Sequence, residues 1–308
     1  MNGIGNTPLI KLKNLTDFNS AEIYVKFEGA NPTGSMKDRM ALSMIEGAEK
    51  RGELKKGYKV VEYTGGSTGS SLAMICANKG YKAHFVSSNG FSKEKIQTMR
   101  AFGATVEIIH AENGKLTAGV INKMIARAKE LINEPNTFWT DQINNIDNKL
   151  GYHGMANEII DTLGTGIDEF IMAVGGGGCI SGNSEILKEK IPTLKTIAVE
   201  PLHVRNISGG DTSGTHKLEG IGLSFIPSIL RKDLIDLVIA VSDEDAYRTA
   251  NDLAKFEGIF GGTSSGANVW TAIQRAKIIG PGKKIVTVVC DTGLKYLQGD
   301  LYRNIDNF

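Results

Sequence analysis

Short apolar runs alternate with longer amphipathic segments along the whole chain. The apolar runs are rich in β-branched residues, and several are almost continuously apolar, as expected for parallel strands covered on both faces. They predict strands at Glu22–Phe27, Lys59–Tyr63, Ala83–Ser87, Thr105–His110, Glu169–Val174, Lys195–Val199, Leu237–Val241 and Lys284–Cys290. Apolar positions at helical spacing predict helices at Met36–Arg51, Thr68–Lys79, Ser92–Phe102, Thr117–Asn133, Asp243–Glu257 and Ser265–Lys277. This alternation indicates an α/β protein with parallel sheets.

Length and charge narrow the class of protein. The 308 residues predict two domains at roughly 150 residues each. Lys and Arg number 35 and Asp and Glu 34, so the net charge is +1, which argues against a nucleic-acid or anionic-membrane partner. No apolar run approaches the ~20 residues that cross a bilayer, and the N-terminus does not resemble a secretory signal. The three cysteines are far apart and form no metal-binding spacing, which predicts no metal and a soluble protein in the reducing cytoplasm.

The segment NPTGSMKDR at Asn31–Arg39 contains the first candidate for chemistry. Its first residues favour a turn, and Ser35 is expected to cap the following helix. Lys37 then lies in the first helical turn, where the positive end of the helix dipole disfavours a charged amine. A neutral lysine amine is a nucleophile suited to a Schiff base. The alternative interpretation is an ordinary solvated surface lysine.

Three glycine-rich segments follow predicted strands or precede predicted helices, and the chain has 37 glycines in all. In YTGGSTGSS at Tyr63–Ser71, small residues leave backbone N–H groups available to a carboxylate or phosphate; a tight, capped turn is the alternative. In VGGGGCISG at Val174–Gly182, four glycines allow close backbone approach, which favours a phosphate site. This run does not fit GxGxxG, which weakens a dinucleotide site. In GGTSSGA at Gly261–Ala267, a serine hydroxyl either bonds a heteroatom or caps a helix.

A candidate imine lysine, an anion-binding loop, a phosphate cradle and a hydroxyl donor are together the parts of a pyridoxal-phosphate (PLP) site. The chain resembles the family of cysteine synthases (O-acetylserine sulfhydrylases) and cystathionine β-synthases, which are fold-type II PLP enzymes. The resemblance is carried, in the family's order, by GNTPLIKL, NPTGSMKDR, KLEGIGLSFIP, GGTSSGA and CDTGLKYL. It covers essentially the whole chain.

The resemblance assigns roles by position. Lys37 would form the internal aldimine and remove the substrate α-proton. The cofactor phosphate would be held by Gly175, Gly176, Gly177, Gly178 and Cys179, and Ser264 would face the pyridine nitrogen. The α-carboxylate of an amino-acid substrate would be bound by Thr64, Gly65, Gly66, Ser67, Thr68 and Gln142, with Ser67 also near the cofactor. A neutral serine at the ring nitrogen suits elimination through an aminoacrylate better than transamination.

The substrate loop departs from the family pattern TSGNTG, since this chain has TGGSTG. Gly65 replaces a serine, and Ser67 replaces an asparagine whose amide would reach the cofactor and the substrate. The leading hypothesis is β-replacement on O-acetylserine or serine, with sulfide or a thiol as nucleophile. The alternatives are a β-eliminating lyase (a cysteine desulfhydrase that releases hydrogen sulfide, or a serine dehydratase), a non-catalytic binding protein on the same fold, and an NAD-dependent Rossmann enzyme.

The resemblance also implies the domain arrangement. Residues 35–143 would form a smaller domain with the substrate loop, and 1–34 plus 144–308 a larger PLP-binding domain. Both would have three layers, with the cofactor in the cleft between them. A homodimer is implied on the same ground.

Overall fold

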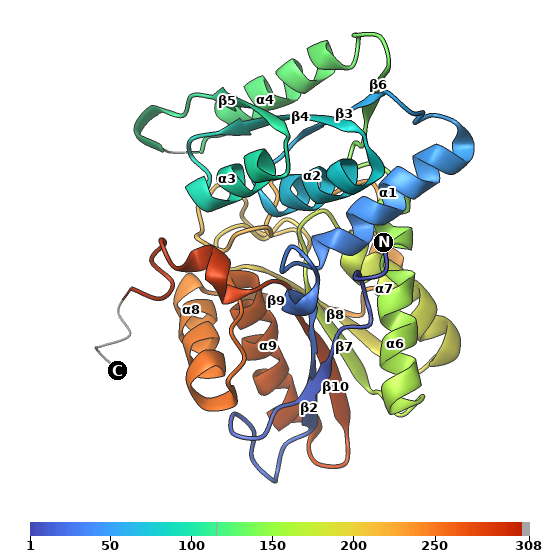
Figure 1. Cartoon of the computed structure of the whole chain (residues 1–308). Coiled ribbons are helices and arrows are strands. Elements are labelled where there is room, and N and C mark those ends of the chain that lie inside the picture. The colour runs from blue at the N-terminus through green and yellow to red at the C-terminus, as the bar shows by residue number, and fades with distance from the viewer. Residues whose placement is uncertain (115, 304–308) are drawn as a thin grey trace. The chain divides into compact units, whose positions relative to one another are not determined.

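The computed structural model describes residues 1–114 and 116–303, which divide into two compact units (Figure 1). Unit 1 comprises Met1–Asn2 and the described residues of Lys37–Gly151. Unit 2 comprises Gly3–Met36 and the described residues from Tyr152 onward. Unit 1 thus runs from 37 to 151, where the sequence predicts 35 to 143. Which unit holds which ligand stays a prediction.

Unit 1 is built on a parallel sheet with strand order β5-β4-β3-β6. Its strands are β3 (Lys59–Tyr63), β4 (Lys82–Ser88), β5 (Thr105–Ile109) and β6 (Thr137–Trp139). Helices α1 (Lys37–Arg51), α2 (Ser67–Lys79) and α3 (Lys93–Ala101) lie on one side of this sheet, α4 (Ala118–Leu131) lies on the other, and α5 (Ile146–Leu150) packs against α1 (Figure 1). Val61 and Val86 point toward α4 and form a core with Met124 and Leu131, because successive strand residues face opposite sides.

Unit 2 contains a sheet with strand order β1-β2-β10-β7-β8-β9, in which β1 is antiparallel to β2 and the other pairs are parallel. Its strands are β1 (Leu9–Lys11), β2 (Glu22–Phe27), β7 (Glu169–Ala173), β8 (Lys195–Pro201), β9 (Leu237–Val241) and β10 (Lys284–Val289). Helices α8 (Asp243–Asp252) and α9 (Thr263–Ile279) cover one face, and α6 (His153–Leu163) and α7 (Gly178–Lys190) cover the other (Figure 1). The unit therefore has three layers, and its main core lies under α9.

The prediction of an α/β protein with parallel sheets is confirmed. Three predicted strands, Glu22–Phe27, Lys59–Tyr63 and Leu237–Val241, have the predicted bounds. The sequence analysis missed β1 and β6, which are three residues each and too short for a periodic signal. It also missed α5, α6 and α7. The helix predicted at Asp243–Glu257 is α8, which ends at Asp252 and continues as a π-helical turn at Leu253–Glu257.

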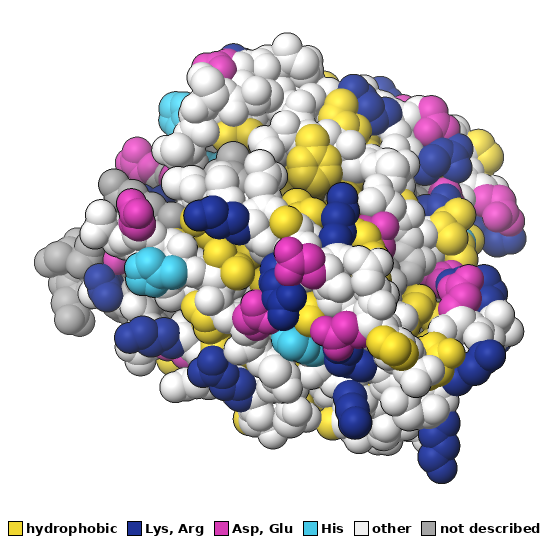
Figure 2. Space-filling model, turned by 90° about the horizontal axis from the view of Figure 1, so that it is seen from above, with side chains coloured by type: hydrophobic (Ala, Val, Ile, Leu, Met, Phe, Trp, Pro, Cys, Tyr) yellow, Lys and Arg dark blue, Asp and Glu magenta, His cyan; other side chains and the backbone are white. Residues whose placement is uncertain are grey.

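The surface carries charges of both signs. On the face drawn in Figure 2, Lys and Arg side chains are interspersed with Asp and Glu side chains. Among the described residues, no helix combines the length and the apolar character that crossing a bilayer requires. Nor do residues 1–114 and 116–303 place three or more His, Cys, Asp or Glu side chains where they could share a metal ion.

Candidate active site

Lys37 is the first residue of α1 and is half-buried. The backbone immediately before it is tied to the segment after β10, since Met36 N donates to Cys290 O at 2.8 Å and Thr292 N donates to Gly34 O at 2.9 Å. Lys37 thus lies in the first helical turn, as predicted, and follows a backbone held by main-chain hydrogen bonds.

Ser35 does not take the predicted capping position. The helix begins two residues later, so Met36 precedes it, and Ser35 instead forms an isolated antiparallel bridge with Asp291. Ser35 therefore pairs with the segment after β10, a tertiary contact that the local sequence does not indicate.

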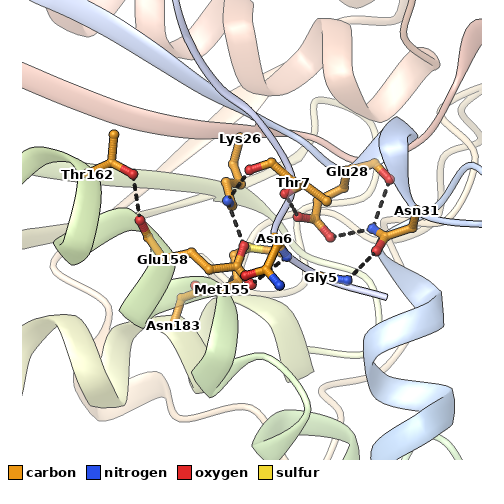
Figure 3. Close-up of polar contacts among 10 residues, drawn as sticks. All are labelled: Gly5, Asn6, Thr7, Lys26, Glu28, Asn31, Met155, Glu158, Thr162 and Asn183. Carbon is orange, nitrogen blue, oxygen red and sulfur yellow. Dashed lines mark hydrogen bonds and ion pairs between the residues drawn. The ribbon is translucent and has the colours of Figure 1, made fainter. Parts of the chain in front are cut away.

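A buried polar network fixes Asn31, at the beginning of the segment that leads to Lys37 (Figure 3). Glu28 accepts hydrogen bonds from Thr7 Oγ1 at 2.6 Å and from Asn31 Nδ2 at 2.8 Å. Gly5 N donates to Asn31 Oδ1 at 2.9 Å, and Lys26 Nζ donates to Thr7 O at 2.6 Å. These contacts join GNTPLIKL to the beginning of NPTGSMKDR, and they bond a buried carboxylate that would otherwise be costly.

The loop between β3 and α2 presents backbone N–H groups. Thr64 Oγ1 accepts from Gly66 N at 3.2 Å and from Gly69 N at 3.1 Å. Gly66 has φ +148°, a conformation that L side chains rarely adopt. Ser67 and Thr68 are the first two residues of α2, so their N–H groups have no acceptor within the helix and suit an anion.

Gln142 lies against this loop. Thr68 Oγ1 donates to Gln142 Oε1 at 2.8 Å, and Gln142 Nε2 donates to Tyr63 O at 3.2 Å. An amide nitrogen has two hydrogens, so Gln142 can donate a second one to a ligand. Unit 1 therefore brings together the predicted substrate-binding residues, although they come from distant parts of the sequence.

Phe91 lies beside Gly65, the glycine that stands where the family pattern has a serine. A Cβ atom on Gly65 would lie 2.6 Å from Phe91 Cε1. Phe91 itself packs on the core beneath α4. The aromatic ring therefore takes the space that the side chain of a serine at position 65 would need.

The glycine-rich segment after β7 leads into α7. Gly177 is the N-cap residue with φ +81°, and no acidic residue lies in the first turn of the helix. A Cβ atom on Gly175 would lie 2.1 Å from Gly220 O, so the loop packs directly on the backbone of the KLEGIGLSFIP segment. Gly178 and Cys179 begin the helix, and their N–H groups with the helix dipole favour a bound anion. Cys179 is 5% exposed.

Ser264 differs from its neighbours in its hydrogen bonds. Thr263 Oγ1 accepts from Glu219 N and Ser265 Oγ accepts from Cys290 N, each at 3.0 Å. Ser264 is 6% exposed, and within the described part of the chain its hydroxyl has no hydrogen-bond partner. Of the hydroxyls of Thr263, Ser264 and Ser265, that of Ser264 is the one available to a heteroatom of a ligand.

The structure thus assembles two sets of predicted residues, one in each unit. Unit 1 contains Lys37, the Thr64–Thr68 loop and Gln142. Unit 2 contains the Gly175–Cys179 loop and Ser264, which are linked through Glu219 and Gly220. That both sets face one ligand stays a prediction.

One polar residue of this region, Glu62, was not among the predicted site residues. It lies in β3, directly before the loop, and burial raises the pKa of its carboxyl to about 7. The available signal was an acidic residue inside the apolar strand KVVEY.

Known proteins are similar to this chain in sequence and in fold. The sequence model of one family, described as pyridoxal-phosphate dependent enzyme, matches residues 1–291. A cysteine synthase of Staphylococcus aureus is 42% identical over 302 residues, which cover 97% of this chain and 95% of that protein. The structure of a hydrogen sulfide-producing enzyme from Fusobacterium nucleatum superimposes with a TM-score of 0.90 at 41% identity, covering 96% of each chain. An O-acetyl serine sulfhydrylase of Entamoeba histolytica superimposes with a TM-score of 0.92 at 36% identity, covering 99% of this chain and 91% of that one.

Proposed function

The chain belongs to the family of pyridoxal-phosphate-dependent enzymes, and from this premise we propose that it catalyses β-replacement on an activated serine. The substrate is O-acetylserine or serine, the nucleophile is sulfide or a thiol, and the product is cysteine or a related thioether amino acid. The observation that carries this proposal is the 42% identity with a cysteine synthase across 97% of the chain. The preformed anion-binding loop supports it.

The residues present fit the cofactor. The start of α7 offers backbone N–H groups, no acidic side chain in its first turn and a left-handed glycine before it, a donor set suited to a phosphate dianion. Ser264 is a buried residue whose hydroxyl is available to the pyridine nitrogen. Lys37, at the beginning of α1, supplies the amine that would hold the aldehyde covalently.

When bound, PLP draws electrons from the substrate Cα, which acidifies its proton and allows the β-substituent to leave. The chain's own residues bind, orient and move protons. The N–H groups of Ser67 and Thr68, with the second amide hydrogen of Gln142, bind the α-carboxylate. Lys37 Nζ takes the proton from Cα as general base. The Thr64–Thr68 loop excludes water while the nucleophile adds at Cβ.

β-Elimination is the second candidate, and Ser67 is the observation that favours it. A serine hydroxyl is shorter than the asparagine amide of the family pattern and has one donor hydrogen where the amide has two. A less restrained substrate gives water more access after the β-substituent leaves. One structural relative is described as a hydrogen sulfide-producing enzyme, which fits a cysteine desulfhydrase.

Product analysis of the holoenzyme distinguishes these two reactions. The purified protein is incubated with O-acetylserine, serine or cysteine, with and without sulfide or a thiol, and the products are quantified. We expect cysteine, or the thioether of the added thiol, as the main product when a nucleophile is present. Pyruvate and ammonia as the only products would exclude β-replacement and establish the lyase.

A homodimer and a cytoplasmic location complete the proposal. The dimer rests on the family resemblance alone. The location is supported by three free, buried cysteines at 76, 179 and 290, since unpaired cysteines are typical of reducing compartments. Sedimentation velocity of the holoenzyme should give twice the 33.1 kDa chain mass; a species at the single-chain mass would contradict the dimer.

A further inference from the structure

Glu62 is a fully buried acidic side chain for which the proposed reaction has no role. Its Oε2 atom accepts hydrogen bonds from Thr140 Oγ1 at 2.6 Å and from Gln142 N at 2.9 Å. Its Oε1 atom accepts from Tyr63 N at 3.0 Å and from Trp139 Nε1 at 3.3 Å. Four donors from two segments therefore converge on one carboxylate.

The two donors to Oε2 lie on either side of Asp141. This residue has φ +44°, in the left-handed region that residues other than glycine seldom adopt. Glu62 bonds the residue before it and the residue after it. The carboxylate therefore holds the chain in a turn that Asp141 by itself would not favour.

Three of the four donors favour the ionised carboxylate. Backbone N–H and indole N–H groups can donate but cannot accept. A proton on Oε1 would face two such groups, and a proton on Oε2 would have one acceptor, the hydroxyl of Thr140, beside the N–H of Gln142. A glutamine at position 62 fits less well, because an amide nitrogen at the Oε2 position could donate to the Thr140 hydroxyl but would lose the hydrogen bond from Gln142 N, and one at the Oε1 position would face two groups that only donate.

The turn held by Glu62 positions the Gln142 side chain. Asn148 Nδ2 donates to Gln142 O at 2.6 Å, which fixes the backbone from the other side. The Gln142 amide then reaches the loop, where it accepts from Thr68 Oγ1 and donates to Tyr63 O. A continuous series of hydrogen bonds thus runs from Glu62 through Gln142 to the first turn of α2.

We propose that Glu62 is a positioning residue, whose carboxylate clamps the Asp141 turn so that the Gln142 amide stays directed at the α-carboxylate of the substrate. This inference rests on the proposed function, in which the ligand is an amino acid whose α-carboxylate is bound by Gln142. Glu62 touches neither the substrate nor the cofactor in this scheme. Its effect should appear in the binding of the carboxylate group and not in the chemical step.

The test uses the Glu62→Gln holoenzyme and L-alanine, an amino acid without a β-leaving group, as binding probe. Binding is followed by the change in cofactor absorbance. We expect the Kd for L-alanine to rise about tenfold, the effect of losing one hydrogen bond to a charged group. With O-acetylserine, KM should rise by a similar factor while kcat at saturation changes about threefold at most.

Glu169→Gln is the matched control. Glu169 is also a buried glutamate on a strand, but it pairs with Arg275 at the start of β7, at the end of the strand opposite the glycine loop. Glu169→Gln removes the charge that pairs with Arg275. It should lower the melting temperature and leave the Kd for L-alanine unchanged. Thr140→Val, which removes one donor to Glu62 Oε2, should give a smaller rise in Kd and serves if Glu62→Gln does not fold.

A double-mutant cycle separates positioning from general destabilisation. If Glu62 acts through Gln142, Gln142→Ala and the double variant Glu62→Gln/Gln142→Ala should bind L-alanine equally weakly. Additive effects, or a wild-type Kd in Glu62→Gln, would overturn the proposal. Failure of the proposed function would be seen differently, as a wild-type enzyme that binds L-alanine but forms no cysteine.

Discussion

At the scale of single residues, two features of the site can be understood only from a contact with a distant residue. A side chain on Gly65 would overlap the ring of Phe91. Asp141 keeps a left-handed backbone beside the Glu62 carboxylate, which bonds both of its neighbours. In each pair, an unusual local feature, a glycine or a left-handed backbone, lies in contact with a residue from another segment of the chain.

Lys37 is the residue whose removal tests the reaction most directly. Lys37→Ala should abolish turnover and remove the absorbance of the covalent imine, because no amine would remain at that position to bond the aldehyde or take the α-proton. The measurement is a visible absorption spectrum with an activity assay.

Lys50→Ala, an exposed lysine in the last turn of the same helix, is the control. It should retain both the absorbance and the activity. An active Lys37→Ala enzyme that still carries the imine would refute the assignment.

At the scale of elements, sequence patterns located most strands well because their signal is local. A run such as Lys59–Tyr63 is apolar, β-branched and followed by small residues, and each of these properties can be recognised without the fold. The α7 helix was missed because it begins in a glycine run, and glycine disfavours helix by about 1 kcal/mol per residue relative to alanine. Its residues from Gly178 to Ser184 are buried, so tertiary packing outweighs that preference.

The loop before α7 permits a prediction about cofactor binding. Gly175→Ala would place a Cβ atom 2.1 Å from the carbonyl oxygen of Gly220, a backbone atom that cannot move without shifting its own segment. The loop must then move away from the helix start that is proposed to bind phosphate. We expect PLP affinity to fall at least about tenfold, since several charge-assisted hydrogen bonds depend on this geometry.

Cofactor content per chain, measured by absorbance during PLP titration, checks this expectation. Gly166→Ala is the control, because the nearest atom to its added Cβ is a lysine Nζ at 3.9 Å. Equal PLP affinity in the two variants would show that the loop tolerates displacement.

At the scale of the whole molecule, the ionisation of Glu62 should make the free energy of unfolding depend on pH. Burial raises its folded-state pKa from 4.5 to about 7. The folded chain therefore holds this proton more tightly than the unfolded chain. By linkage, the contribution of Glu62 to the free energy of unfolding falls as pH rises from about 4.5 to about 7, by about 3 kcal/mol in all.

Denaturant unfolding of the wild type and of Glu62→Gln between pH 5 and pH 8 measures this effect. The free energy of unfolding of Glu62→Gln minus that of the wild type should increase as pH rises. This difference should become constant above about pH 7. A difference that stays constant across this range would contradict the raised pKa. The ionised form that suits the donors is thus obtained at a cost in stability, a common compromise at functional sites.

The sequence by itself determined the α/β alternation, eight of the strands to within two residues at each end, the glycine-rich loops before α2 and α7, and the first-turn position of Lys37. These properties depend on neighbouring residues, through side-chain periodicity and the backbone needs of glycine. Only the tertiary structure decided the Gly65–Phe91 contact, the pairing of Ser35 with Asp291 and the hydrogen bonds from Glu62 to the Gln142 segment, whose partners are 80 residues apart. A contact between distant segments leaves no local periodicity, so it becomes visible only when the folded sheet brings its partners together.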